Sequence, residues 1–201
     1  IERKLNWRKG ITRIEVMLET PQLLPQLEEA VDAAGARCLG VHFGAYDYTA
    51  ACDVASVSQS LAHPWCDHAR HLMKLSLAGT DVRLSDGATT TLPIGPHRAR
   101  EGAPLSFDAQ TENRRVVHGA WREAYTNIQR ALTQGFYQGW DLHPAQLTVR
   151  YAAVYEFFLD GFESTAERLK GFIASAARAT RAGAAFDDAA TGQAMLNLVV
   201  R

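Results

Sequence analysis

Four short apolar runs alternate along this chain with stretches of helical periodicity, and this alternation limits the fold more than any other feature. The runs do not alternate between apolar and polar residues, as is typical of strands covered on both faces. They span residues 14–18, 38–43, 80–84 and 136–142. Helical patterns follow the first three runs and end at Gly35, Gly79 and Gly135. The sequence therefore predicts an α/β fold built on parallel strands.

The length of 201 residues suffices for one good-sized domain. After the fourth run the pattern becomes wholly helical, and we expect residues 161–201 to form a C-terminal helical extension of a domain at residues 1–160. The connection over residues 85–110 is rich in Gly, Pro and Thr and is longer than a connector needs to be. Such a segment predicts a functional loop or lid.

Composition excludes several classes of protein. The formal net charge is −1, which leaves no basic surface for a nucleic-acid backbone. No uncharged apolar run approaches the roughly 20 residues that cross a bilayer. The three cysteines form no C-x-x-C pair, so we expect small apolar side chains and neither a disulfide framework nor a zinc site. We expect a soluble, cytoplasmic protein that binds neither nucleic acid nor membranes.

Acidic residues stand at the ends of the apolar runs, where parallel α/β folds collect their functional groups. They are Glu19, Asp47, Asp86 and Asp141, the last with His143 close by. Two carboxylates on adjacent strand ends suit Mg²⁺ or Mn²⁺, which prefer oxygen ligands. A structural role is open for each of them as well: stabilising a helix N-terminus, forming a turn, or starting the next helix.

Four segments carry a family resemblance. They are I-E-V-M-L-E-T-P (14–21), L-G-V-H-F-G-A-Y-D-Y (39–48), D-V-R-L-S-D-G (81–87) and G-W-D-L-H-P-A-Q (139–146). In this order they resemble the later strands of the HpcH/HpaI aldolase and citrate lyase beta-subunit family, within the phosphoenolpyruvate/pyruvate-type barrel superfamily. Malate synthases share the E-T and G-x-x-D-Y features more distantly. The resemblance covers most of residues 11–160 and looks closest to a bacterial branch of the superfamily.

The resemblance implies a (β/α)8 TIM-barrel fold, of which this chain would supply strands five to eight and a helical extension. It implies Mg²⁺ held by Glu19 and Asp47. The substrate-binding segment it implies comprises Gly44, Ala45, Tyr46 and Asp47, with the amides of the last two on a substrate carboxylate. The family cleaves or forms a carbon–carbon bond next to an enolate of pyruvate or of an acyl-CoA.

The early strands of that barrel have no counterpart here. Eight strands need about 250 residues, and a free half-barrel would leave open edge strands. We therefore expect a longer natural chain, assembled as a homo-oligomer. In citrate-lyase-like members the tail carries an aspartate that lies over a neighbouring subunit, and A-A-F-D-D-A-A at 184–190 resembles that place loosely. Asp188 is thus a candidate proton donor, with an N-cap of the last helix as the alternative.

The sequence leads to one functional hypothesis and two alternatives. We expect a Mg²⁺- or Mn²⁺-dependent carbon–carbon lyase or aldolase that acts on a 2-oxo acid or an acyl-CoA. Its catalytic candidates are Asp141, His143 and Asp188. The alternatives are a malate-synthase-like condensing enzyme and a catalytically silent barrel with an interaction or regulatory role. Arg98 and Arg100 could meet a CoA phosphate, but acidic residues share their segment, so we favour the small 2-oxo acid.

Overall fold

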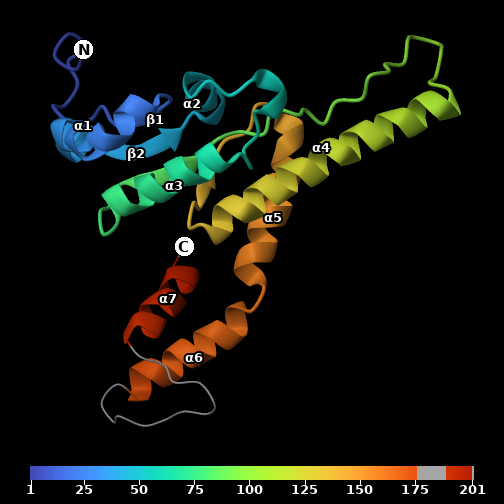
Figure 1. The fold of residues 1–201 in the computed structure, drawn as a ribbon. Helices are drawn as coiled ribbons and strands as arrows, with labels where there is room; N and C mark the ends of the chain where they lie inside the picture. The colour runs from blue at the N-terminus through green and yellow to red at the C-terminus, as the bar shows by residue number, and fades with distance from the viewer. Residues whose placement is uncertain (176–188, 201) are drawn as a thin grey trace. The chain divides into compact units, whose positions relative to one another are not determined.

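The computed structural model describes residues 1–175 and 189–200. The chain forms two compact units, Ile1–Arg150 and Tyr151–Arg201, and Figure 1 labels the α-helices of both and the first two strands. The first unit holds a sheet with its helices, and the described part of the second unit is helical. The second unit starts at Tyr151, within a helix.

The first unit is built on a four-stranded sheet in which all neighbours are parallel. The strands are β1 (Ile14–Leu18), β2 (Cys38–Phe43), β3 (Arg83–Asp86) and β4 (Gln138–Gly139). Their order in the sheet is their order in the chain. Right-handed crossovers in such a sheet place the connecting helices on one face. The predicted α/β fold with a parallel sheet is confirmed.

Each connection between strands contains helix. The helices are α1 (Leu27–Ala34), α2 (Ala45–Ala51), α3 (Pro64–Leu77) and α4 (Phe107–Thr133), with 3₁₀ turns at Pro21–Gln26, Gly35–Arg37, Ser56–Ser58 and Pro144–Gln146. α3 begins at the predicted Pro64. α4 begins well before its apolar face does, because the Ser106 side chain caps it by accepting a hydrogen bond from Ala109 N (3.2 Å).

Two strands differ from their predicted bounds. Thr80 belongs to the turn after α3, because its amide and its hydroxyl both donate to Leu77 O (3.2 and 2.8 Å). β3 therefore starts at Arg83. The fourth strand is shorter than predicted because Phe136 N still donates to Ala131 O at the end of α4 (2.9 Å).

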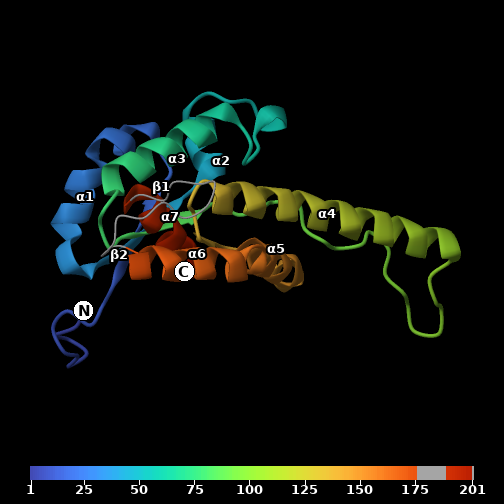
Figure 2. The same ribbon diagram turned by 90° about the horizontal axis from the view of Figure 1, so that it is seen from below.

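The face of the sheet that meets the helices carries the hydrophobic core. Leu18, Val41 and Phe43 are buried there with residues of α1 and α3. Figure 2 shows α1 and α3 together on this side of β1 and β2. Because side chains alternate along a strand, His42, between Val41 and Phe43, faces the opposite side of the sheet.

The long segment between β3 and α4 lies along α4 (Figure 1, Figure 2). The Asn113 side chain donates to His97 O and accepts from His97 N, both at 2.9 Å. A Cβ on Gly95 would lie 2.5 Å from the Asn113 side chain, so glycine permits this approach. Closer to β3, Asn127 Nδ2 donates to Thr89 Oγ1 (3.0 Å). These contacts hold the segment that the sequence predicts as a lid.

The second unit is described by its own helices. α5 (Leu147–Leu159) leads into it, and α6 (Phe162–Ser175) and α7 (Ala189–Val199) follow. α6 and α7 pack closely at Gly192, where a Cβ would lie 2.6 Å from Phe172 Cε1. Among the described helices of the whole chain, none is long and apolar enough to cross a membrane.

Candidate functional site

The ends of β1 and β2 bring Glu19 against Gly44. Leu18 pairs with Phe43 in the sheet, and Gly44 N donates to Leu18 O (2.8 Å), so the two residues that follow are neighbours. A Cβ on Gly44 would lie 2.4 Å from Glu19 Cγ. Any larger residue at this position would therefore displace the Glu19 side chain.

The chain enters α2 directly after Gly44, and the first turn of this helix carries the predicted substrate-binding residues. Gly44 O accepts from Tyr48 N (2.9 Å), which closes the first turn. The amides of Ala45, Tyr46 and Asp47 precede that bond and have no acceptor within the helix. The amide of Gly44 is already paired with β1, so Gly44 contributes space and not a donor.

Glu19 and Asp47 stand apart from the other acids at strand ends because no cation accompanies them. Glu19 is half-buried and Asp47 is exposed. Within residues 1–175 and 189–200, neither carboxylate takes part in a hydrogen bond or an ion pair. Two negative charges therefore stand at adjacent strand ends without a counter-ion from the described protein.

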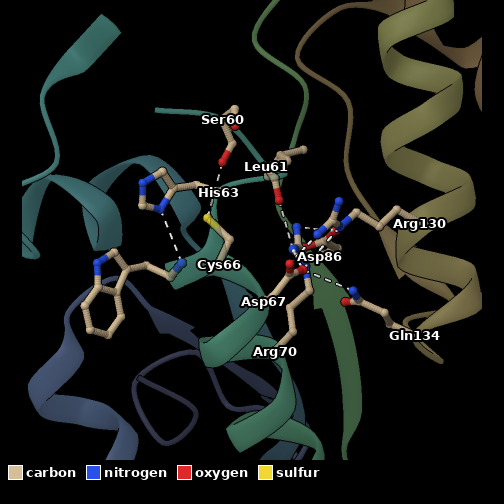
Figure 3. A network of polar contacts seen from close by, with 10 residues as sticks. Ser60, Leu61, His63, Cys66, Asp67, Arg70, Asp86, Arg130 and Gln134 are labelled. Carbon is tan, nitrogen blue, oxygen red and sulfur yellow. Dashed lines mark hydrogen bonds and ion pairs between the residues drawn. The ribbon is translucent and has the colours of Figure 1, made fainter. Parts of the chain in front are cut away.

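Asp86, at the end of β3, is neutralised on the helix side of the sheet (Figure 3). Arg70 of α3 donates from Nε to Oδ1 (2.9 Å) and from Nη2 to Oδ2 (3.0 Å) of this carboxylate. Arg70 Nη1 also donates to Leu61 O (2.9 Å). Arg70 and Asp86 are 1% and 3% exposed, so the pair is a buried anchor between α3 and β3.

Asp67 extends this network to α4 (Figure 3). Its Oδ1 accepts from Arg70 Nη1 (3.3 Å) and from Gln134 Nε2 (3.1 Å), and Arg130 donates to both of its oxygens. Burial by itself would raise the pKa of Asp67, but the hydrogen bonds from Arg130 and Gln134 lower this pKa below its ordinary value. The network connects α3 with α4 and with β3 on the face of the sheet that the helices cover.

Asp141 and His143, the catalytic candidates after β4, both have local partners. Arg150 donates from Nε to Asp141 Oδ2 (2.5 Å) and from Nη2 to Asp141 Oδ1 (3.0 Å). His143 Nδ1 accepts from Ala145 N (3.1 Å), which occupies that ring nitrogen. Their catalytic roles stay predictions. Asp188, the third candidate, lies outside the described residues.

Gln146 connects the ends of β3 and β4. Its Oε1 accepts from the amides of Leu142 (2.8 Å) and His143 (3.1 Å), and its Nε2 donates to Thr89 O (2.8 Å). The side chain is fully buried. It therefore fixes the segments that leave two adjacent strands at the same edge of the sheet.

The face of the sheet that points away from the helices carries a buried histidine, His42. His42 is paired in register with Met17 of β1 and Ser85 of β3, and its ring makes an edge contact with Trp140 (4.7 Å between centroids, 77° between planes). His42 is 7% exposed, and its Nε2 has no hydrogen-bond partner in the described chain. Sequence reasoning assigned it no role, although a histidine inside an apolar strand is a signal.

The donor set at Glu19 and Asp47 fits a hard divalent cation. Both offer carboxylate oxygens, which Mg²⁺ and Mn²⁺ prefer, and Gly44 keeps the space beside Glu19 free of a side chain. No group of three or more His, Cys, Asp or Glu in the described residues is arranged to hold a metal ion. A cation here would depend on two carboxylates and take its other ligands from water and substrate.

A family model described as Domain of unknown function (DUF6986) matches residues 1–201. The chain belongs to this family. A search of the curated proteins gives no match to this DUF6986 chain.

Two solved structures show what the DUF6986 chain is similar to. A citrate lyase from Burkholderia xenovorans LB400 matches with a TM-score of 0.69 at 17% identity, over 99% of this chain and 55% of that one. RipC from Yersinia pestis matches with a TM-score of 0.47 at 18% identity, over 71% of this chain and 52% of that one. The DUF6986 chain thus spans about half the length of these proteins. The first match shows a citrate-lyase-like fold.

Proposed function

We propose that this protein is a Mg²⁺- or Mn²⁺-dependent carbon–carbon lyase or aldolase that acts on a 2-oxo acid. The observation that carries the proposal is the pair of carboxylates Glu19, directly after β1, and Asp47, in the first turn of the helix after β2, neither of which has a counter-ion among the described residues. Asp86 and Asp141, the other two acids at strand ends, are each paired with an arginine. The citrate-lyase-like fold agrees with this reading.

Each group at the site has a task in this reaction. A divalent cation held by Glu19 and Asp47 would polarise the substrate carbonyl and stabilise the enolate. The amides of Tyr46 and Asp47, at the start of α2, would bind the substrate carboxylate. Gln146 would keep the segments after β3 and β4 in place around the substrate.

We extend the proposal to the assembly. In a (β/α)8 barrel each strand pairs with the next along the chain and the helices lie outside, which agrees with the order β1-β2-β3-β4 and with helices on one face. The four strands would form the fifth to eighth strands of such a barrel, in a homo-oligomer. The face that bears His42 would then line the barrel interior.

Turnover of aldol-type substrates tests the proposal. The protein is incubated with 2-oxo acids that carry a hydroxyl β to the carbonyl, and the released pyruvate is measured with Mg²⁺ and after EDTA. We expect activity that requires the metal and falls by more than about 100-fold in Glu19→Gln. Activity that survives both EDTA and Glu19→Gln would refute it. Cleavage of an acyl-CoA in place of a 2-oxo acid would replace the substrate class and keep the metal site.

A further inference from the structure

His42 is a buried polar side chain whose ring nitrogen lacks a partner. It is 7% exposed, and Nε2 has no hydrogen bond within residues 1–175 and 189–200. Buried polar atoms in folded proteins are nearly always paired. Nε2 of His42 is therefore a buried polar atom to which the described residues offer no partner.

The alternation of β2 places this imidazole on the same side of the sheet as the candidate metal ligand. Val41 and Phe43 belong to the core under the helices, so His42 and Gly44 face the other side. The Glu19 side chain lies against Gly44. Two residues along a strand span about 6.6–6.8 Å. The backbone of His42 thus lies one row before Gly44, beside which the Glu19 side chain lies, and the His42 ring contacts Trp140.

The surroundings of His42 favour a neutral ring that is held in place. Trp140 contacts it edge-on, with ring centroids 4.7 Å apart. Burial lowers the pKa of His42 below its ordinary value, against smaller opposite effects of Glu15 and Asp86. A neutral imidazole can accept a proton and return it, as a general acid and base must.

We propose that His42 is a catalytic residue of this site and that its Nε2 transfers the proton during carbon–carbon bond cleavage. The inference rests on the proposed lyase function. The residue itself follows from its burial, from its Nε2 without a partner among the described residues, and from its place on the face of the sheet that bears Gly44 and Glu19.

The step balances without a further reactant. Nε2 accepts the proton of the hydroxyl β to the carbonyl, and the electron pair of that O–H bond forms the carbonyl of the leaving aldehyde. The bond between the α and β carbons breaks, and its electron pair passes into the enolate. The imidazolium of His42 then gives its proton to the α carbon. The products are an aldehyde and pyruvate or a longer 2-oxo acid, and His42 is neutral again.

Proton exchange on pyruvate isolates the second half of this step. The protein is incubated with Mg²⁺ and pyruvate in D₂O, and loss of the methyl proton signal is followed by NMR. We expect exchange in the wild type and a rate lower by about 100-fold or more in His42→Gln. His71→Gln is the matched control, because His71 is an exposed histidine of α3 and should leave the rate unchanged.

Oxalate, which mimics the enolate of pyruvate and chelates Mg²⁺, separates the two hypotheses. Calorimetry should show that oxalate binds to the wild type and to His42→Gln when Mg²⁺ is present. A wild type that does not bind oxalate with Mg²⁺ would refute the proposed function. Oxalate binding with no exchange in the wild type, or with equal exchange in His42→Gln, would overturn the role of His42 alone.

A second measurement does not depend on how well His42→Gln folds. In protein labelled with ¹⁵N-histidine, the Nε2 resonance of His42, assigned with His42→Asn, should shift when oxalate is added with Mg²⁺. A resonance that stays in place while oxalate binds would show that His42 does not contact the ligand, and would overturn the inference.

Discussion

Arg70 is the side chain whose removal we expect to destabilise the fold strongly. It is 1% exposed and donates to both oxygens of Asp86 and to Leu61 O. Arg70→Met keeps most of the volume but leaves the Asp86 carboxylate, which is 3% exposed, without its cation. Breaking a buried ion pair from one side costs about 3–5 kcal/mol. For a chain of this length, that loss lowers Tm by roughly 6–20 °C.

Urea denaturation and thermal unfolding measure this loss. The double variant Arg70→Met/Asp86→Leu removes both charges and should recover most of the stability. Lys170→Met breaks an exposed ion pair with Glu167 and should leave Tm nearly unchanged, which makes it the control. A loss below about 1 kcal/mol in Arg70→Met, or a double variant as unstable as the single one, would refute the reasoning.

Three further predictions rest on single contacts. Gly44→Ala would place a Cβ 2.4 Å from Glu19 Cγ and should weaken Mn²⁺ binding by more than about tenfold in an EPR titration. Gly119→Ala is the control, because a Cβ there meets nothing within 4 Å. It should leave Mn²⁺ binding unchanged and stabilise the protein by about 0.5–1 kcal/mol. Burial lowers the pKa of His42 in the folded state, so the unfolded state binds a proton at this imidazole more readily. The free energy of unfolding should therefore fall as pH falls from about 6.5 towards the pKa of the folded state. This fall should be less steep in His42→Gln. Gln146→Met leaves the buried Thr89 O and the part-buried amide of Leu142 without this partner and should lower the free energy of unfolding by about 1–3 kcal/mol in urea denaturation. Unchanged Mn²⁺ binding in Gly44→Ala would contradict the first prediction. The same pH dependence of stability in His42→Gln and the wild type would contradict the second. A Gln146→Met variant as stable as the wild type would contradict the third.

Local sequence signals predicted part of the fold. β1 and β2 coincide with their apolar runs because each run is compact and is followed at once by residues that end a strand. The start of α4 could not be read from hydrophobic spacing, because its buried residues begin only at Ala120, and the Ser106 cap and Asp108 mark its first turn. Thr80 looked like the start of β3, but its hydroxyl closes the turn after α3.

The candidate site was harder to predict from the sequence than the fold, because the partners of its residues are set by tertiary contacts. Spacing and family resemblance singled out Glu19 and Asp47, and the structure adds that no arginine among residues 1–175 and 189–200 neutralises them. Nothing in the local sequence pairs Asp86 with Arg70, which lies sixteen residues away and meets it only because α3 folds back on β3. Sequence reasoning gave His42 no role because an apolar strand predicts burial, and only the structure shows that its buried Nε2 has no partner within the described part of the chain.

Metal binding is the direct test of the site at Glu19 and Asp47. Mn²⁺ is titrated into the wild type, Glu19→Gln and Asp47→Asn, and free Mn²⁺ is followed by EPR; Glu28→Gln, an exposed acid of α1, is the control. We expect one Mn²⁺ bound per chain in the wild type and in Glu28→Gln. The affinity for Mn²⁺ should be weaker by more than about tenfold in Glu19→Gln and in Asp47→Asn. Equal Mn²⁺ affinity in all four proteins, or none in any of them, would contradict it.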